Sequence, residues 1–82
     1  MNAARLQQLA TNNEGFCFDP GTGETYQLNE SAQILLTALR SGSSEVEAAK
    51  ILAEAFTITL SEAQSDTYEF IQMLRIYGVT GT

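Results

Sequence analysis

Histidine and tryptophan are absent from this chain of 82 residues, and only one cysteine and one proline occur. Without histidine, the side chain that most often acts as a base near neutral pH or binds a metal is unavailable. A lone cysteine cannot form an internal disulfide, which predicts a cytoplasmic location. Cys17 has no histidine partner, so we interpret it as a small strand residue and not as a nucleophile. We therefore expect no enzymatic activity, no cofactor and no metal.

Positive charge is also scarce, because four Lys and Arg residues stand against ten Asp and Glu residues, for a net charge of −6. This balance argues against binding to nucleic acids or to anionic membranes, which recruit basic side chains. No apolar run approaches the roughly 20 residues of a membrane span, and the N-terminus shows no signal-peptide pattern. An acidic surface instead favours faster association with a basic peptide or a basic patch on a partner.

The apolar fraction of 44% and the charged fraction of 17% are typical of a folded globular chain. We expect one small domain over residues 1–82, with a thin core. Residues 1–13 are weakly patterned, with Leu6 and Leu9 as the large apolar side chains after Met1. We expect a strand over residues 5–10, because a two-stranded hairpin gains from a third strand; a helical turn is the alternative.

Two short alternating segments flank the turn DPGTG at residues 19–23 and predict a β-hairpin. Its glycines permit positive φ, and its proline suits the end of a strand. A loop of about five residues does not fix the register of the two strands. The side chains that we expect to face the core are Phe16, Phe18, Tyr26 and Leu28.

Three helices are expected after the hairpin. The first covers residues 30–40, with Asn29 as its N-cap and Gly42 just past its end. The second begins at a capping box formed by Ser44 and Glu47. The expected core stripes of these two helices are Ala32, Leu35, Leu36 and Leu39, then Val46, Ala49, Leu52, Ala53 and Phe56.

The third helix follows the link at residues 57–59, with Thr59 or Ser61 as the competing N-caps. Gly78 is expected to end it, ahead of an irregular tail over residues 79–82. Its buried face is predicted to comprise Ala63, Thr67, Phe70, Ile71 and Leu74. The order predicts an α+β, winged-helix-like fold, in which a small antiparallel sheet of two or three strands precedes three helices.

The short link between the last two helices has the length of a DNA-binding helix-turn-helix. The would-be recognition helix carries three acidic residues, Glu62, Asp66 and Glu69, and one basic residue, Arg75. The phosphates of DNA should therefore repel this helix. An acidic winged-helix regulator or dimerisation module remains the alternative to a peptide-binding protein.

The return strand, Glu24 to Leu28, offers unpaired backbone groups if it lies at the edge of the sheet. The third helix carries more large apolar side chains than one stripe needs, and these either cover the sheet or a dimer partner or line a groove. An edge strand beside an apolar wall suits β-augmentation, in which a peptide adds as a further strand. Such an edge is also open to a second copy, so monomer and homodimer both stay open.

The segment from Phe18 to Ala32, FDPGTGETYQLNESA, resembles the strand-to-helix segment of the PqqD family. These are small peptide chaperones named for pyrroloquinoline quinone (PQQ) synthesis, together with related recognition elements of peptide-modifying systems. The resemblance spans about residues 16–79. Its other motifs are residues 34–39 with Gly42, residues 47–56, and Asp66, Phe70, Leu74 and Gly78.

This resemblance implies a winged-helix-like domain that binds the leader of a ribosomally made precursor peptide as an added strand. It also implies delivery of that peptide to a modifying enzyme, often a radical-SAM enzyme, in PQQ or a related biosynthesis. No cofactor is implied for the domain itself. The residues that the resemblance assigns to peptide binding are Glu24, Thr25, Tyr26, Gln27, Leu28, Tyr68, Ile71, Gln72, Arg75 and Ile76.

Overall fold

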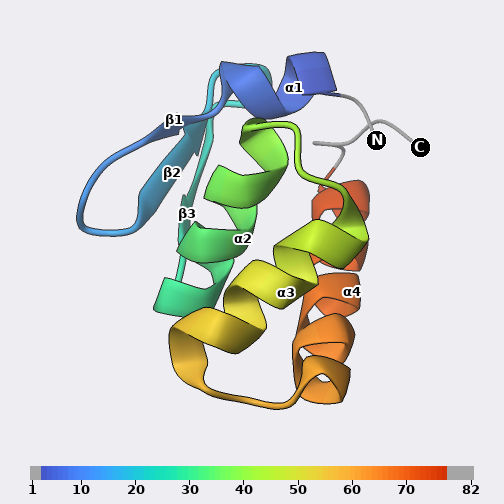
Figure 1. Ribbon diagram of the computed structural model, residues 1–82. Helices are drawn as coiled ribbons and strands as arrows, with labels where there is room; N and C mark the ends of the chain where they lie inside the picture. The colour runs from blue at the N-terminus through green and yellow to red at the C-terminus, as the bar shows by residue number, and fades with distance from the viewer. Residues whose placement is uncertain (1–2, 78–82) are drawn as a thin grey trace.

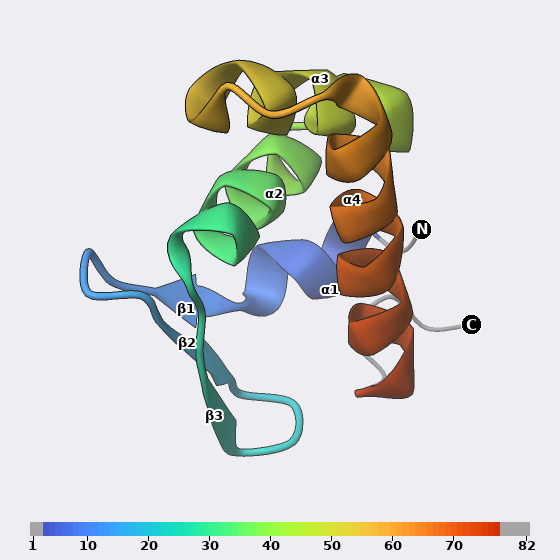
Figure 2. The same ribbon diagram turned by 90° about the horizontal axis from the view of Figure 1, so that it is seen from below.

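The computed structural model describes residues 3–77, in which four helices and three strands follow one another along the chain (Figure 1). The elements are α1 (Ala3–Gln8), β1 (Ala10–Thr11), β2 (Phe16–Asp19), β3 (Glu24–Gln27), α2 (Glu30–Arg40), α3 (Glu45–Phe56) and α4 (Leu60–Ile76). The strands form one antiparallel sheet in the order β1-β2-β3. The predicted α+β fold is therefore confirmed. The sheet lies at one side and α4 at the other, with α1 and α2 between them (Figure 2).

The N-terminal segment is a correction to the sequence prediction, because α1 occupies most of the range in which a strand was expected. Leu6 and Leu9 are 1% and 3% exposed and belong to the core. A spacing of three brings two side chains to one side of a helical turn, whereas it places them on opposite faces of a strand. The third strand exists, but it is the two-residue β1, which starts at Ala10 and pairs with β2.

The β2–β3 hairpin forms as predicted, but the faces of its first strand are reversed. Phe16 and Phe18 are 41% and 43% exposed, whereas Cys17 and Asp19 are buried. The reason is the register, which pairs Cys17 with Tyr26 and so places both on the inner face. Phe16 and Phe18 do share one face of the strand, as predicted, but this face is directed away from the helices.

Helix α2 begins and ends as predicted, because Asn29 caps it through a 2.9 Å hydrogen bond from the backbone N–H of Ala32. Gly42 follows it with a φ of +94°. The predicted capping box opens α3, with Ser44 and Glu47 each accepting a hydrogen bond from the other's backbone N–H. One stripe residue was wrong, since Val46 is 56% exposed and the buried residue in that turn is Ala48.

Helix α4 starts after Thr59, whose hydroxyl accepts a hydrogen bond from the N–H of Glu62, so Ser61 is not the cap. Its predicted core face is confirmed: Ala63, Thr67, Phe70, Ile71 and Leu74 are all buried. Helices α2 and α3 pack on each other, and α3 packs on α4. The predicted stop at Gly78 and the tail at 79–82 lie outside the described residues.

Candidate functional site

One edge of the sheet is open along β3, since β2 is its neighbour on the other side in the described part of the chain. The N–H of Leu28 donates to the carbonyl oxygen of Gly15 at 2.7 Å, so Leu28 directs its backbone groups toward β2. Backbone direction alternates along a strand, and Thr25 and Gln27 therefore direct their N–H and C=O groups toward the open edge. The hydrogen bond from the N–H of Asn12 to the carbonyl of Phe16 fits the same alternation on β2.

A groove with a volume of about 360 Å³ lies between the end of β3, the start of α2 and one face of α4. We call it the β3–α4 groove. The residues that line it are Gln27, Leu28, Asn29, Ser31, Ala32, Leu35, Asp66, Glu69, Phe70 and Met73. Its apolar members include the core residues Leu28, Leu35 and Phe70 and the partly buried Met73. The groove thus joins an apolar floor to the strand that carries the open edge.

Two carboxylates, Asp66 and Glu69, give the α4 side of this groove a negative rim. Both side chains are exposed. Among the side chains that the structure describes, residues 6–77, neither carboxylate has a hydrogen-bond or ion-pair partner. The groove therefore combines apolar surface with two free negative charges.

An aromatic contact between β3 and α4 lies next to this groove. The rings of Tyr26 and Tyr77 are 4.9 Å apart between centroids, with their planes at 50°. Burial, followed by the carboxylate of Glu24, raises the pKa of the Tyr26 phenol, which stays neutral at pH 7. This pair ties the inner face of the strand to the C-terminal end of the helix.

The structure separates the residues that the resemblance assigned to peptide binding. Tyr68 and Ile76 are 58% and 81% exposed, and Arg75 is exposed as well, but none of these side chains lines the β3–α4 groove. Gln72 also lies outside the groove, and Ile71 is buried in the core. On β3 and just beyond it, Gln27 and Leu28 line the groove and Tyr26 contacts Tyr77.

The α4 residues that do line the groove were missed as site residues by sequence reasoning. They are Asp66, Glu69, Phe70 and Met73, at spacings of three, four and seven along the helix. This spacing marks one helical face, which was the available signal. The apolar surplus on α4 pointed to the helix that lines the groove, but it did not identify which flank faces β3.

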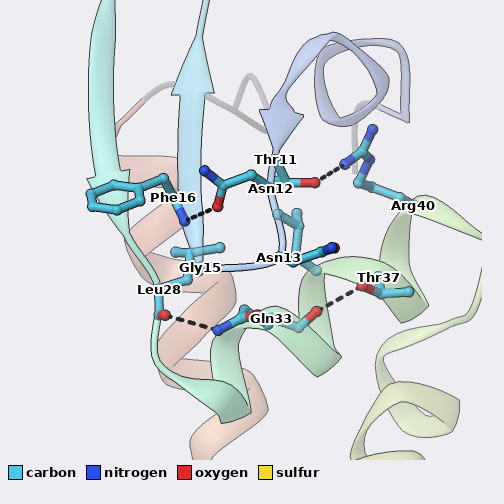
Figure 3. A pocket seen from close by; sticks show the side chains of 10 residues that line it. Thr11, Asn12, Asn13, Gly15, Phe16, Leu28, Gln33, Thr37 and Arg40 are labelled. Carbon is cyan, nitrogen blue, oxygen red and sulfur yellow. Dashed lines mark hydrogen bonds between the residues drawn. The ribbon is translucent and has the colours of Figure 1, made fainter.

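A second hollow, of about 290 Å³, lies between the β1–β2 turn and α2 and is shown in Figure 3. Its polar groups pair largely with one another. The side-chain oxygen of Asn12 accepts from the N–H of Phe16 at 3.1 Å, and Gln33 donates to the carbonyl of Leu28 at 3.1 Å. Arg40 donates to the hydroxyl of Thr11 at 3.3 Å. We interpret the role of this hollow as structural, because the hydrogen bonds of its lining residues hold the end of β3 against α2.

The next features are the described side chains that could react or bind a metal. Burial raises the pKa of the Cys17 thiol, which disfavours the reactive thiolate. Within residues 3–77, no three of the His, Cys, Asp and Glu side chains gather as a metal site. Across the same residues, no helix combines the length and apolar character needed to span a membrane.

Comparison with known proteins gives one match. No curated protein and no solved structure is significantly similar to the chain. The family model described as coenzyme PQQ synthesis protein D (PqqD) matches residues 14–79, from the β1–β2 turn through α4. This match covers most of the 82 residues, and the chain therefore belongs to the PqqD family.

Proposed function

We propose that this chain binds the leader of a ribosomally made precursor peptide as an added strand on β3 and presents it to a modifying enzyme. Membership of the PqqD family makes it a peptide-binding protein related to PQQ biosynthesis, in a family of non-catalytic accessory chaperones. The observation that carries the proposal is the open edge of β3 directly beside the β3–α4 groove.

The edge and the groove suit complementary parts of an extended peptide. The backbone groups of Thr25 and Gln27 are directed outward and would pair with the peptide backbone, which gives affinity without sequence preference. Alternate peptide side chains would point inward, on the side of Tyr26 and Leu28, and meet Phe70 and Met73. Selectivity then comes from the groove, and the domain itself supplies no catalytic group.

Delivery to an enzyme is the second half of the proposal. The side of α4 that faces away from the groove carries the exposed Tyr68, so a bound peptide leaves this side accessible. We propose a radical-SAM enzyme as the recipient, in the cytoplasm. We further propose that residues 1–82 act as one domain.

The α4 face that contacts the peptide is tested by two matched variants. Binding of the leader peptide of a precursor encoded beside this chain's gene is measured by calorimetry. Met73→Ser removes apolar surface from the groove and should weaken binding roughly tenfold, since burial of such a side chain contributes about 1.5 kcal/mol or more. Tyr68→Ser, on the side of α4 that faces away from the groove, should bind like the wild type. Wild-type binding by Met73→Ser, with loss of binding in Tyr68→Ser, would favour the side of α4 on which the resemblance placed Tyr68.

A further inference from the structure

We propose that the β3–α4 groove selects a peptide that carries a lysine or arginine two residues away from an apolar side chain. This inference rests on the proposed peptide-binding function and adds the chemistry of the preferred sequence. The apolar residue occupies the floor at Phe70 and Met73. The basic residue lies at the rim, between Asp66 and Glu69.

The spacing follows from the geometry of a strand laid along a helix. Inward-pointing side chains on a strand recur every second residue, about 6.6 Å apart. On α4 the rim pair and the floor pair are centred four residues apart, which is about 6 Å along the helix axis. Two consecutive inward side chains of one peptide therefore reach the floor and the rim together.

The groove should prefer a basic peptide side chain because its two carboxylates repel each other and have no basic partner. Asp66 and Glu69 are three residues apart on one helix, a distance at which like charges repel. Neither is neutralised by another described residue, and the residues that line the groove include no Lys or Arg. A cationic side chain between them gains two attractions and relieves one repulsion, whereas an acidic side chain at that position is repelled.

The experiment selects random dodecapeptides displayed on phage against the immobilised chain. Three proteins are compared: the wild type, Asp66→Asn with Glu69→Gln, and Glu45→Gln with Glu54→Gln. The last pair removes the same net charge from α3, outside the groove. The wild type and the α3 control should enrich peptides with Lys or Arg two positions from a large apolar residue. The Asp66/Glu69 variant should retain the apolar preference and lose the basic one.

Two further measurements test the inference: the affinity of a selected peptide, and the selection by a variant with reversed charges. The peptide most enriched on the wild type should bind the Asp66→Asn/Glu69→Gln variant about threefold to tenfold more weakly, the range expected for two partly exposed charge pairs. Asp66→Lys with Glu69→Lys should instead enrich Asp or Glu at that peptide position. These variants change exposed side chains and spare the core.

The outcomes separate this inference from the proposed function. Enrichment of apolar peptides with no basic preference, or a basic preference that persists in the Asp66/Glu69 variant, would overturn the inference and leave peptide binding intact. A wild-type protein that enriches no peptide would count against both.

Discussion

At Gly15, the neighbouring atoms leave no room for a larger side chain. Its φ is +90°, and a Cβ atom there would lie 2.6 Å from the carbonyl oxygen of Leu28 and 2.8 Å from the side-chain nitrogen of Gln33. Gly15 also accepts the 2.7 Å hydrogen bond from Leu28 that holds the end of β3 against β2. We expect Gly15→Ala to lower the free energy of unfolding by about 2–4 kcal/mol, measured by urea denaturation.

Gly23 is the control for that substitution. Its φ is +77°, but a Cβ atom added there would meet no other part of the chain within 4 Å. Gly23→Ala should therefore cost about 1 kcal/mol, the backbone cost alone. Equal losses in the two variants would mean that the contact at Leu28 does not matter.

Phe18 tests which face of β2 is buried. It is 43% exposed, and its inward neighbour Cys17 is 2% exposed. Phe18→Thr keeps a strand-forming residue and should cost less than about 1 kcal/mol in urea denaturation, whereas loss of a core phenylalanine costs about 3–5 kcal/mol. A loss of about 3–5 kcal/mol in the free energy of unfolding would show that Phe18 is buried in the core.

The reversal at Phe18 shows why the hairpin was only partly predictable. Strand alternation groups residues onto two faces, but it does not say which face lies inside. Two aromatic residues favour the inner face by hydrophobicity, and the register with Tyr26 decides otherwise. Asp19 is fully buried among the residues of this face, where its carboxylate accepts from the N–H of Gly21 at 2.9 Å. That local hydrogen bond cannot be read from composition.

Helix starts were predictable because capping is local. Asn29, Ser44 and Thr59 each accept a hydrogen bond from a backbone N–H three residues ahead. The sequence indicated the first two caps and left Thr59 and Ser61 as alternatives for the third. Helix α1 was not predictable on the same grounds, because Leu6 and Leu9 alone do not define a period. Its formation depends on packing against α2, which is a tertiary contact.

The capping box of α3 gives a prediction about pH. The backbone N–H of Ser44 donates to the carboxylate of Glu47 at 2.9 Å and, with the Ser44 side chain, lowers the pKa of that carboxyl. A folded-state pKa below the unfolded value stabilises the fold above the unfolded pKa of about 4.3, and this stabilisation is lost as the pH falls through the folded value. Glu47→Gln should therefore lose less stability than the wild type between pH 6 and pH 3 in urea titrations. Identical losses would contradict the hydrogen bond.

Across the whole molecule, the sheet and α4 lie on opposite sides of α1 and α2 (Figure 2). They approach each other at the Tyr26–Tyr77 contact and at the groove, which lies where β3 passes into α2. The sequence pattern predicted a peptide-binding site on β3 and α4, and both elements border the groove. It did not identify which flank of α4 faces the strand, because that depends on how α4 packs through Phe70, Ile71 and Leu74. The same open edge also allows pairing with a second copy, which light scattering at two concentrations would reveal.

Amide hydrogen exchange at β3 tests the central claim most directly. In the free protein the N–H groups of Thr25 and Gln27 should exchange fast, whereas that of Leu28, bonded to Gly15, should exchange slowly. Addition of a groove-binding peptide should slow exchange at Thr25 and Gln27 and leave Leu28 unchanged. Slow exchange at Thr25 and Gln27 without peptide, or no slowing with it, would contradict strand addition on this edge.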